Sequence, residues 1–280
     1  MALKKIDIEP LSSAMGATIT GVDLSDNLDN ETVDDIHQAL LDNHVIFFRD
    51  QTLTPERHKM FGRHFGSLNI HPYVKGMADH EEVMEIIKEP EEKVNFGGGW
   101  HSDMSFLEEP AMGSILYAVE TPPIGGDTLF ANQHLAYETL SDGMKDMLGG
   151  LVAIHTAGEE YSRKGHSAQQ RVSMDVKQID EAPTYEHPVV RTHPQTGRKA
   201  LYVNRGFTIR FKNMTRAESK PLLDYLYKHS TREPFTCRFR WQPGSIAFWD
   251  NRSVQHYALN DYHGHRRHMR RVTINGDRPF

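Results

Sequence analysis

His101 and Asp103 stand two residues apart in the chain, and His256 follows far downstream in the segment Trp249–His256. Residues i and i+2 of an extended segment point to the same side, so His101 and Asp103 can face one cavity. Two imidazoles and one carboxylate on one face of an octahedron suit Fe(II) and leave the opposite face open for a cosubstrate and O2. Together these residues predict the metal site of a non-heme iron oxygenase.

The spacing alone is a weak signal. The chain has 17 histidines, so a chance His-X-Asp sequence is common. A single histidine is more often a hydrogen-bonded core or surface residue than a metal ligand. The prediction therefore depends on the other motifs of the chain.

The composition indicates one soluble, cytoplasmic protein. A chain of 280 residues can form a single β-rich domain, and we expect one domain over residues 1–280. The formal charge of −6 provides no basic field for nucleic acid. Cys237 is the only cysteine, which fits a reducing compartment. The N-terminus lacks the apolar run of a secretory signal, and no stretch is apolar enough to span a membrane.

The first quarter of the chain has an α/β pattern. Val33, Ile36 and Leu40 recur at helical spacing over residues 31–43, and the buried strand Val45–Phe48 follows. Thr54 and Pro55 form an N-cap with proline at the first helical position. This second helix is expected to have an apolar face that carries Met60, Phe61 and Phe65.

The remainder of the chain favours a sandwich of short strands. The apolar or alternating runs Ser114–Val119 and Phe235–Trp241 predict two of them. Thr215 and Glu218 form a capping box that starts a helix through about Lys228, with Leu222, Leu223 and Leu226 facing the core. Residues 158–183 are polar and without clear period, so we expect a mobile loop there.

Ordered motifs along almost the whole chain resemble the taurine dioxygenase family, the taurine/2,4-dichlorophenoxyacetate group of Fe(II)/2-oxoglutarate dioxygenases. The motifs are Gly16-Ala17, Gly21–Leu24, Phe48–Gln51, Trp100–Phe106, Gly125–Thr128, His187–Pro194, Trp249–Arg252, Arg266-Arg267 and Arg270-Arg271. The resemblance implies a mainly β fold with flanking helices, the double-stranded β-helix or jelly roll. It also implies a homo-oligomer.

The same resemblance assigns roles to individual residues. His101, Asp103 and His256 are expected to bind Fe(II), with no catalytic side chain beyond these ligands. Thr128 and Arg267 are assigned to the far carboxylate of 2-oxoglutarate, and a guanidinium holds a carboxylate well through two parallel hydrogen bonds. The residues expected to contact the prime substrate are His71, Tyr73, Phe207 and Arg271.

Alternation along the arginine-rich segment is consistent with this assignment. If residues 265–271 enter a strand, Arg267, Met269 and Arg271 share one side and Arg266, His268 and Arg270 the other. Asp250 and Asn251 are expected to orient the chain around His256 rather than to bind the metal. For Phe207, ordinary core packing is as good an interpretation as a substrate contact.

The expected reaction hydroxylates a C–H bond with O2 and converts 2-oxoglutarate to succinate and CO2. The expected substrate is a small anion, namely an organosulfonate, alkyl sulfate or aryloxyalkanoate, whose hydroxylated product can collapse to a carbonyl compound. Taurine itself is an alternative. The family's taurine enzymes have asparagine where this chain has Gly97, and the tyrosine after His71 comes one residue early, at Tyr73.

Two other classes stay open. Two histidines, a carboxylate and a bound water also suit a zinc-dependent hydrolase, although that interpretation gives Thr128 and Arg267 no role. The second of these classes is a non-catalytic jelly-roll module that binds a small anion or another protein. The presence of all three candidate metal ligands argues against that module.

Overall fold

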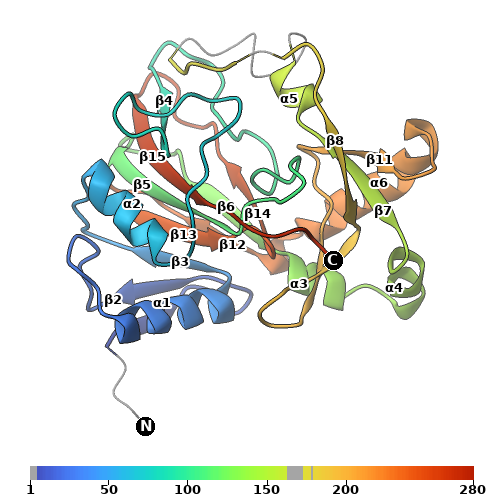
Figure 1. Cartoon of the computed structure of the whole chain (residues 1–280), viewed down its shortest axis with the longest axis horizontal. Helices are drawn as coiled ribbons and strands as arrows, with labels where there is room; N and C mark the ends of the chain where they lie inside the picture. Colours follow the sequence, from blue (N-terminus) through green and yellow to red (C-terminus); the bar gives the residue numbers. More distant parts are fainter. Residues whose placement is uncertain (1–4, 163–172, 178) are drawn as a thin grey trace.

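The computed structural model of the chain describes residues 5–162, 173–177 and 179–280, and it is mainly β with helices at the periphery (Figure 1). The strands are β1 (Asp7–Pro10), β2 (Ala17–Thr20), β3 (Val45–Phe48), β4 (Val83–Lys88), β5 (Gly113–Glu120), β6 (Thr128–Asn132), β7 (Val152–Thr156), β8 (Thr184–Pro188), β9 (Val190–Thr192), β10 (Lys199–Leu201), β11 (Thr208–Phe211), β12 (Thr236–Phe239), β13 (Ile246–Asp250), β14 (Val254–Ala258) and β15 (Arg267–Ile274). The helices are α1 (Asn30–Asn43), α2 (Pro55–Arg63), α3 (Gln133–Glu138), α4 (Asp142–Leu148), α5 (Gly158–Tyr161), α6 (Arg216–Ser230) and the 3-10 turn Glu233–Phe235.

Two sheets enclose the main core. The larger has the strand order β1-β2-β3-β13-β5-β15-β4, and the smaller has the order β12-β6-β14. Phe47 of the large sheet packs against Phe130 and Phe239 of the small one, with the Phe47 and Phe239 rings stacked at a centroid distance of 4.0 Å. This arrangement is the expected double-stranded β-helix. Its aromatic interior fixes the spacing of the sheets, between which the chemically important side chains lie.

Helices α1 and α2 pack on the outer face of the large sheet (Figure 1). Both begin as expected, because Asp29 caps α1 and Thr54 caps α2 through side-chain bonds to backbone amides. Phe61 is buried at the end of α2, but Met60 is exposed. Placing Met60 on the apolar face was therefore wrong, because neighbouring helical residues point about 100° apart. Phe61 reaches the core, and Phe65 packs partly buried against the same cluster, as expected.

The later elements follow the expectations in outline. The capping box of Thr215 and Glu218 starts α6, in which Leu223 and Leu226 are buried. Leu222 packs only partly buried against the same cluster. The strand expected over residues 235–241 is shorter, since β12 spans only Thr236–Phe239.

The expected mobile loop over residues 158–183 lies in part outside the described residues, which omit 163–172 and 178. Within the described part, helix α5 begins at Gly158, and Val176 forms an antiparallel bridge with Val74. Ser162 bridges Ile179. The flanks of this segment are thus attached to the body of the fold, and its mobility stays a prediction.

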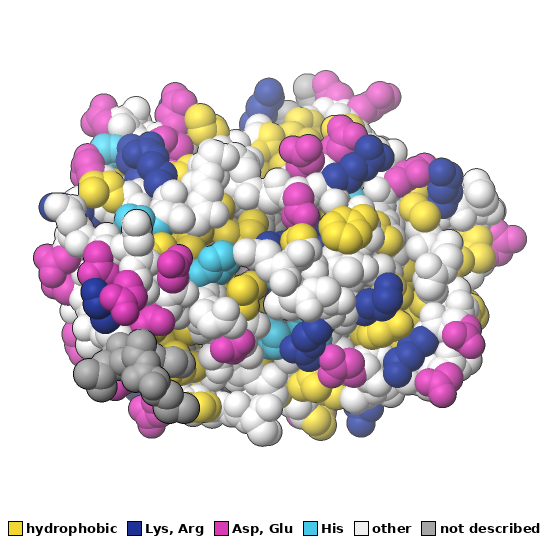
Figure 2. Space-filling model, turned by 60° about the horizontal axis from the view of Figure 1, so that its bottom comes forward, with side chains coloured by type: hydrophobic (Ala, Val, Ile, Leu, Met, Phe, Trp, Pro, Cys, Tyr) yellow, Lys and Arg dark blue, Asp and Glu magenta, His cyan; other side chains and the backbone are white. Residues whose placement is uncertain are grey.

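Acidic and basic side chains are interspersed on the face shown in Figure 2 rather than gathered into one basic field. None of the helices that the structure describes has the length and apolar character needed to cross a membrane.

Candidate active site

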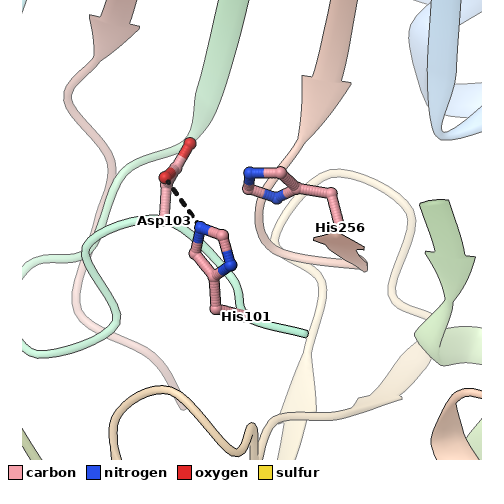
Figure 3. A group of neighbouring side chains, drawn as sticks. All are labelled: His101, Asp103 and His256. Carbon is pink, nitrogen blue, oxygen red and sulfur yellow. Dashed lines mark ion pairs between the residues drawn. The ribbon is translucent and has the colours of Figure 1, made fainter. Parts of the chain in front are cut away.

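His101, Asp103 and His256 meet in the interior (Figure 3). All three are buried, and one nitrogen or oxygen atom from each lies within 4.8 Å of the others. His101 and Asp103 come from the irregular segment between β4 and β5, and His256 from β14. The backbones of the two histidines also pair, because the His101 amide donates to the His256 carbonyl at 3.1 Å and the His256 amide donates back at 2.8 Å. The structure thus brings the three expected ligands together.

The hydrogen bonds of His101 define its tautomer. Its Nδ1 lies 2.7 Å from the carbonyl oxygen of Gly99, which can only accept, so Nδ1 carries the proton. Nε2 therefore presents its lone pair toward Asp103, whose Oδ1 is 3.6 Å away. A histidine held through one nitrogen by a carbonyl is oriented to bind a metal through the other.

Asp103 is held ionised by its neighbours. Oδ1 accepts a hydrogen bond from Nη1 of Arg271 at 2.7 Å, and Oδ2 accepts one from Oγ of Ser114 at 2.7 Å. Burial is the largest single influence and favours the protonated acid, but Arg271, His256 and His101 together outweigh it and hold the pKa of Asp103 well below its ordinary value. The site therefore offers a carboxylate rather than a carboxylic acid.

Asn251 connects the two parts of the centre. Its Oδ1 accepts from the Asp103 amide at 3.2 Å and from Nε1 of Trp249 at 2.9 Å, and its Nδ2 donates to Ser114 at 2.9 Å. Asn251 thus orients Asp103, whereas the expected role was to orient the chain around His256. Asp250 instead pairs with Arg252 at 2.6 Å, away from the ligands.

The donor set fits Fe(II). It consists of two imidazoles and one carboxylate, all buried, and Nδ1 of His256 has no hydrogen-bond partner among the described residues. Burial is the largest cause that lowers the pKa of His256 well below its usual value, so its ring is neutral and able to bind a cation. Two nitrogens and one oxygen on one side of a metal are typical of non-heme iron oxygenases.

Arg267 and Thr128 form a second polar group. The expected alternation of β15 is present, with Arg267, Met269 and Arg271 buried and His268 and Arg270 half-buried on the other side. The Arg267 guanidinium is 5% exposed, yet its Nε and Nη2 have no partner among the described residues. A buried charge without a partner is costly, so this geometry calls for an anion.

Trp241 links Thr128 to Arg267. Its Nε1 donates to Oγ1 of Thr128 at 2.9 Å, and the Arg267 guanidinium carbon lies 5.8 Å from its ring centroid. Because Oγ1 already accepts from the indole, the hydroxyl proton of Thr128 is free to donate. Thr128 and Arg267 together match the donors that a carboxylate needs.

A cavity of about 310 Å³ opens beside His101 and Asp103. Its polar lining includes His71 and Arg271, and also Asn95, Glu160 and Arg205. Its apolar and aromatic walls are formed by Phe96, Met104, Phe106, Tyr161 and Phe207. Such a cavity suits a ligand with one anionic group and an apolar body.

His71 is fixed with its donor N–H at Nε2, which lies 3.5 Å from the hydroxyl oxygen of Tyr161, another residue that lines the cavity. Its Nδ1 accepts from the backbone amides of Tyr73 at 3.1 Å and Val74 at 3.0 Å, so the proton of the neutral ring lies on Nε2. Burial, followed by the charge of Arg271, lowers the pKa of His71 to about 3. A neutral N–H and a guanidinium therefore lie near each other in the lining of the cavity.

Phe207 and Tyr73 lie in different places. Phe207 lines the cavity, with its ring 6.1 Å from that of His101. Tyr73 is not among the residues that line the cavity. It packs behind them, against Tyr161 at 4.9 Å and Phe106 at 5.7 Å between ring centroids. Its position supports the wall rather than a direct contact.

Gly97 has a backbone conformation that favours glycine. Its φ is +73°, and a Cβ there would lie 3.2 Å from Cε1 of His101. An asparagine at this position would need both strain and a shift of a candidate metal ligand. The absent side chain leaves this part of the cavity wall open.

Ser114 and Tyr161 are site residues that the sequence did not indicate. Ser114 reaches Asp103 only through the pairing of distant strands, and nothing in its neighbourhood along the chain marks it. Tyr161 falls in a polar stretch without clear period, although it is 2% exposed in the structure. Its aromatic character in that stretch was the one available signal.

Comparisons with known proteins agree with this geometry. A sequence profile described as "Taurine catabolism dioxygenase TauD, TfdA family" matches residues 7–273. An alkylsulfatase from Acinetobacter baylyi is 35% identical over 277 residues, covering 98% of this chain and 86% of that protein. An alpha-ketoglutarate-dependent sulfate ester dioxygenase from Pseudomonas putida is 35% identical, covering 98% and 91%.

Solved structures give the same result. The crystal structure of a taurine dioxygenase from Burkholderia xenovorans superposes with a TM-score of 0.82 at 37% sequence identity, covering 98% of this chain and 92% of that one. The match of the family profile spans nearly the whole chain and includes His101, Asp103 and His256. The chain therefore belongs to the TauD/TfdA family of dioxygenases.

Proposed function

We propose that this protein is an Fe(II)- and 2-oxoglutarate-dependent dioxygenase that hydroxylates a C–H bond of a small anionic substrate. His101, Asp103 and His256 hold the metal, and Arg267 and Thr128 hold the far carboxylate of 2-oxoglutarate. The observation that carries the proposal is the buried Arg267, whose Nε and Nη2 have no hydrogen-bond partner among the described residues, in a chain that also brings His101, Asp103 and His256 together. A zinc hydrolase would give that arginine no role.

The residues of the chain have separate tasks in this reaction. When bound, Fe(II) and 2-oxoglutarate supply the oxidising chemistry, in which O2, substrate and 2-oxoglutarate give hydroxylated product, succinate and CO2. Asp103 contributes a negative charge, and Ser114 and Asn251 fix its direction. Phe106 and Phe207 exclude water from the cavity.

The cavity favours a substrate with one anionic end. His71 Nε2–H and Arg271 provide a neutral and a charged donor for that end, while the aromatic wall takes the apolar remainder. Organosulfonates, alkyl sulfates and aryloxyalkanoates have this form. If the attacked carbon carries the sulfonate, sulfate or ether oxygen, the hydroxylated product collapses to a carbonyl compound and releases the leaving group.

Relatives with such printed activities support this substrate class. One is named a sulfate ester dioxygenase and another a 2,4-dichlorophenoxyacetate dioxygenase. Taurine is the second candidate, since a taurine dioxygenase is among the similar solved structures. Gly97 disfavours it because glycine offers no side-chain hydrogen bond to an aminoethyl group.

The first experiment combines metal analysis with turnover. The protein is reconstituted anaerobically with Fe(II), and O2 uptake and succinate formation are followed with taurine, alkanesulfonates, alkyl sulfates and phenoxyalkanoates. We expect succinate and a carbonyl product in equal amounts with one of the larger anions. Faster turnover of taurine than of every other anion would contradict the substrate assignment. Stoichiometric zinc with hydrolysis and no O2 uptake would contradict the reaction class.

A cytoplasmic location and a homo-oligomeric state belong to the same proposal. The lone Cys237 is buried, so its thiol is not available to form a disulfide at the surface. Size-exclusion chromatography with light scattering measures the oligomeric state. A monomer at micromolar concentration would contradict the proposed homo-oligomer.

A further inference from the structure

Lys88, the last residue of β4, is a second buried cation near Arg267. The residue is 3% exposed, and its Nζ has no hydrogen-bond partner among the described residues. Its ammonium lies 4.4 Å from the ring centroid of Tyr262. Burial lowers the pKa of Lys88, and the nearby carboxylate of Glu92, which acts in the opposite direction, offsets this only in part. Lysine is almost never this buried unless it is paired.

The register of the sheet brings Lys88 to Arg267. β4 and β15 pair antiparallel, and Lys88 stands directly opposite Arg267. Directly opposed residues project to the same face with Cβ atoms about 5 Å apart. Both are buried members of an alternating strand, so both side chains enter the space between the sheets.

Tyr262 and Gly126 place the two cations around one small space. A Cβ at Gly126 would lie 3.3 Å from Cδ1 of Tyr262 and 3.4 Å from Cδ of Arg267, so both side chains flank this glycine. Lys88 lies over the same tyrosine ring. Two positive charges on one face repel each other, and the nearby carboxylates of Glu92 and Asp127 offset the effect of burial only in part, so an anion that joins the two cations stabilises them.

We propose that Lys88 is a second cation for the far carboxylate of the cosubstrate, and that it sets the preference for a dicarboxylate over a monocarboxylate 2-oxo acid. The inference rests on the proposed function of Arg267 and Thr128 as the site of that carboxylate. Arg267 supplies the planar pair of donors, and Lys88 supplies a charge from the opposite strand. The anion in turn neutralises two cations whose buried nitrogens have no hydrogen-bond partner among the described residues.

The competing explanation is that the Tyr262 ring alone holds the ammonium through a cation–π contact. The two explanations predict opposite effects of Lys88→Met on the stability of the ligand-free protein. If the ring holds Lys88, Lys88→Met loses a favourable contact and the ligand-free protein unfolds at lower urea concentration. If an anion is the partner, the ligand-free Lys88→Met protein is at least as stable as wild type, since it no longer buries an unpaired charge.

The test measures binding by calorimetry on the Fe(II)-loaded protein under anaerobic conditions. Two probes are compared: 2-oxoglutarate, and 2-oxopentanoate, which has the same five carbons but a methyl group in place of the far carboxylate. We expect Lys88→Met to raise the dissociation constant of 2-oxoglutarate about tenfold and to leave that of 2-oxopentanoate unchanged. Lys88→Gln is the second variant and is expected to show the same difference. Lys212→Met is the control, because it removes an exposed lysine that pairs with Glu186.

The variant Arg267→Met distinguishes a failure of the proposed carboxylate pocket from a failure of the proposed role of Lys88. If this variant keeps its preference for 2-oxoglutarate, the assignment of the carboxylate pocket fails together with the inference. If Arg267→Met loses the preference but both Lys88 variants keep it, only the role of Lys88 is overturned. A loss of preference in Lys88→Met, combined with undiminished ligand-free stability, supports it.

Discussion

Asp103 contributes one carboxylate to the candidate metal centre and uses both of its oxygens in hydrogen bonds. Arg271 and Ser114 hold the two oxygens, and Asn251 holds Ser114 in turn. Hydrogen-bond partners behind a ligand orient it and adjust its basicity. The affinity for metal therefore depends on residues that would never touch the metal.

Ser114→Ala tests this dependence. The substitution removes the donor to Asp103 Oδ2 and leaves Nδ2 of Asn251 without its acceptor. We expect the dissociation constant for Fe(II) or Mn(II) to rise about tenfold while the fold is retained. Titration of the metal-free protein with Mn(II), followed by electron paramagnetic resonance, measures the change.

Ser253→Ala is the matched control. Ser253 is also a buried serine near the centre, but its Oγ has no hydrogen-bond partner among the described residues. Its removal should leave metal affinity unchanged. Equal effects of the two substitutions would show that Ser114 does not act through Asp103.

At the scale of residues, the three candidate ligands were predictable from the sequence, but the residues that support them were not. His101, Asp103 and His256 belong to motifs with recognisable spacing. Ser114 and Lys88 acquire their meaning only from neighbours on other strands, and such pairings are not visible along the chain. The charged faces of β15 were predictable because alternation is a local property.

The turn before β6 is an element whose shape determines a pocket. Gly126 has a φ of +70°, and its missing Cβ leaves room for Tyr262 and for Arg267. Only glycine adopts this backbone region without steric cost. The turn therefore positions Thr128, the first residue of β6, opposite the arginine.

Gly126→Ala should affect both stability and ligand binding. The backbone strain lowers the free energy of unfolding by about 1 kcal/mol. The new methyl group also presses on Arg267, so the dissociation constant of 2-oxoglutarate should rise severalfold. Urea denaturation and calorimetry measure the two effects.

Gly264→Ala separates strain from contact. Gly264 has a φ of +80°, but nothing lies within 4 Å of the position of its Cβ. It should lower stability by a similar amount and leave cosubstrate binding unchanged. A normal dissociation constant in Gly126→Ala would mean that the turn does not shape the pocket.

At the scale of the whole molecule, buried neutral histidines make the fold sensitive to acid. Burial is the main cause that lowers the pKa of His44 and His71 to about 3 and those of His58, His134 and His187 to about 4. In the unfolded chain a histidine has a pKa of about 6.5. Below that value the unfolded chain binds more protons than the folded one, so stability falls as pH falls.

The expected loss is about 1 kcal/mol for each such histidine between about pH 7 and about pH 5.5. Urea denaturation of the metal-free protein at the two pH values measures it. His58→Phe should reduce the loss of stability between the two pH values by the contribution of one histidine. His64→Phe, at an exposed position, should leave that loss unchanged. Equal stability at both pH values would contradict the burial of neutral rings.

The fold class was predictable from the sequence, but the order in which the strands pair was not. The motifs that span the chain led to the jelly roll, and caps such as Asp29 and Thr54 located the helices. The strand order could not be inferred, because β13 pairs with β3 and β5, which lie far from it along the chain. Long-range pairing is set by the closing of the two sheets and not by any local pattern.

The reciprocal backbone hydrogen bonds between His101 and His256 also affect how fast a bound metal could leave the site. Each amide donates to the carbonyl of the other residue, so the two ligands cannot separate unless both bonds break. The opening that parts them is the same event that exposes the two amide hydrogens to exchange with solvent. A metal that leaves by separation of these ligands can depart no faster than the two bonds open, and hydrogen exchange under conditions in which every opening leads to exchange measures that opening rate.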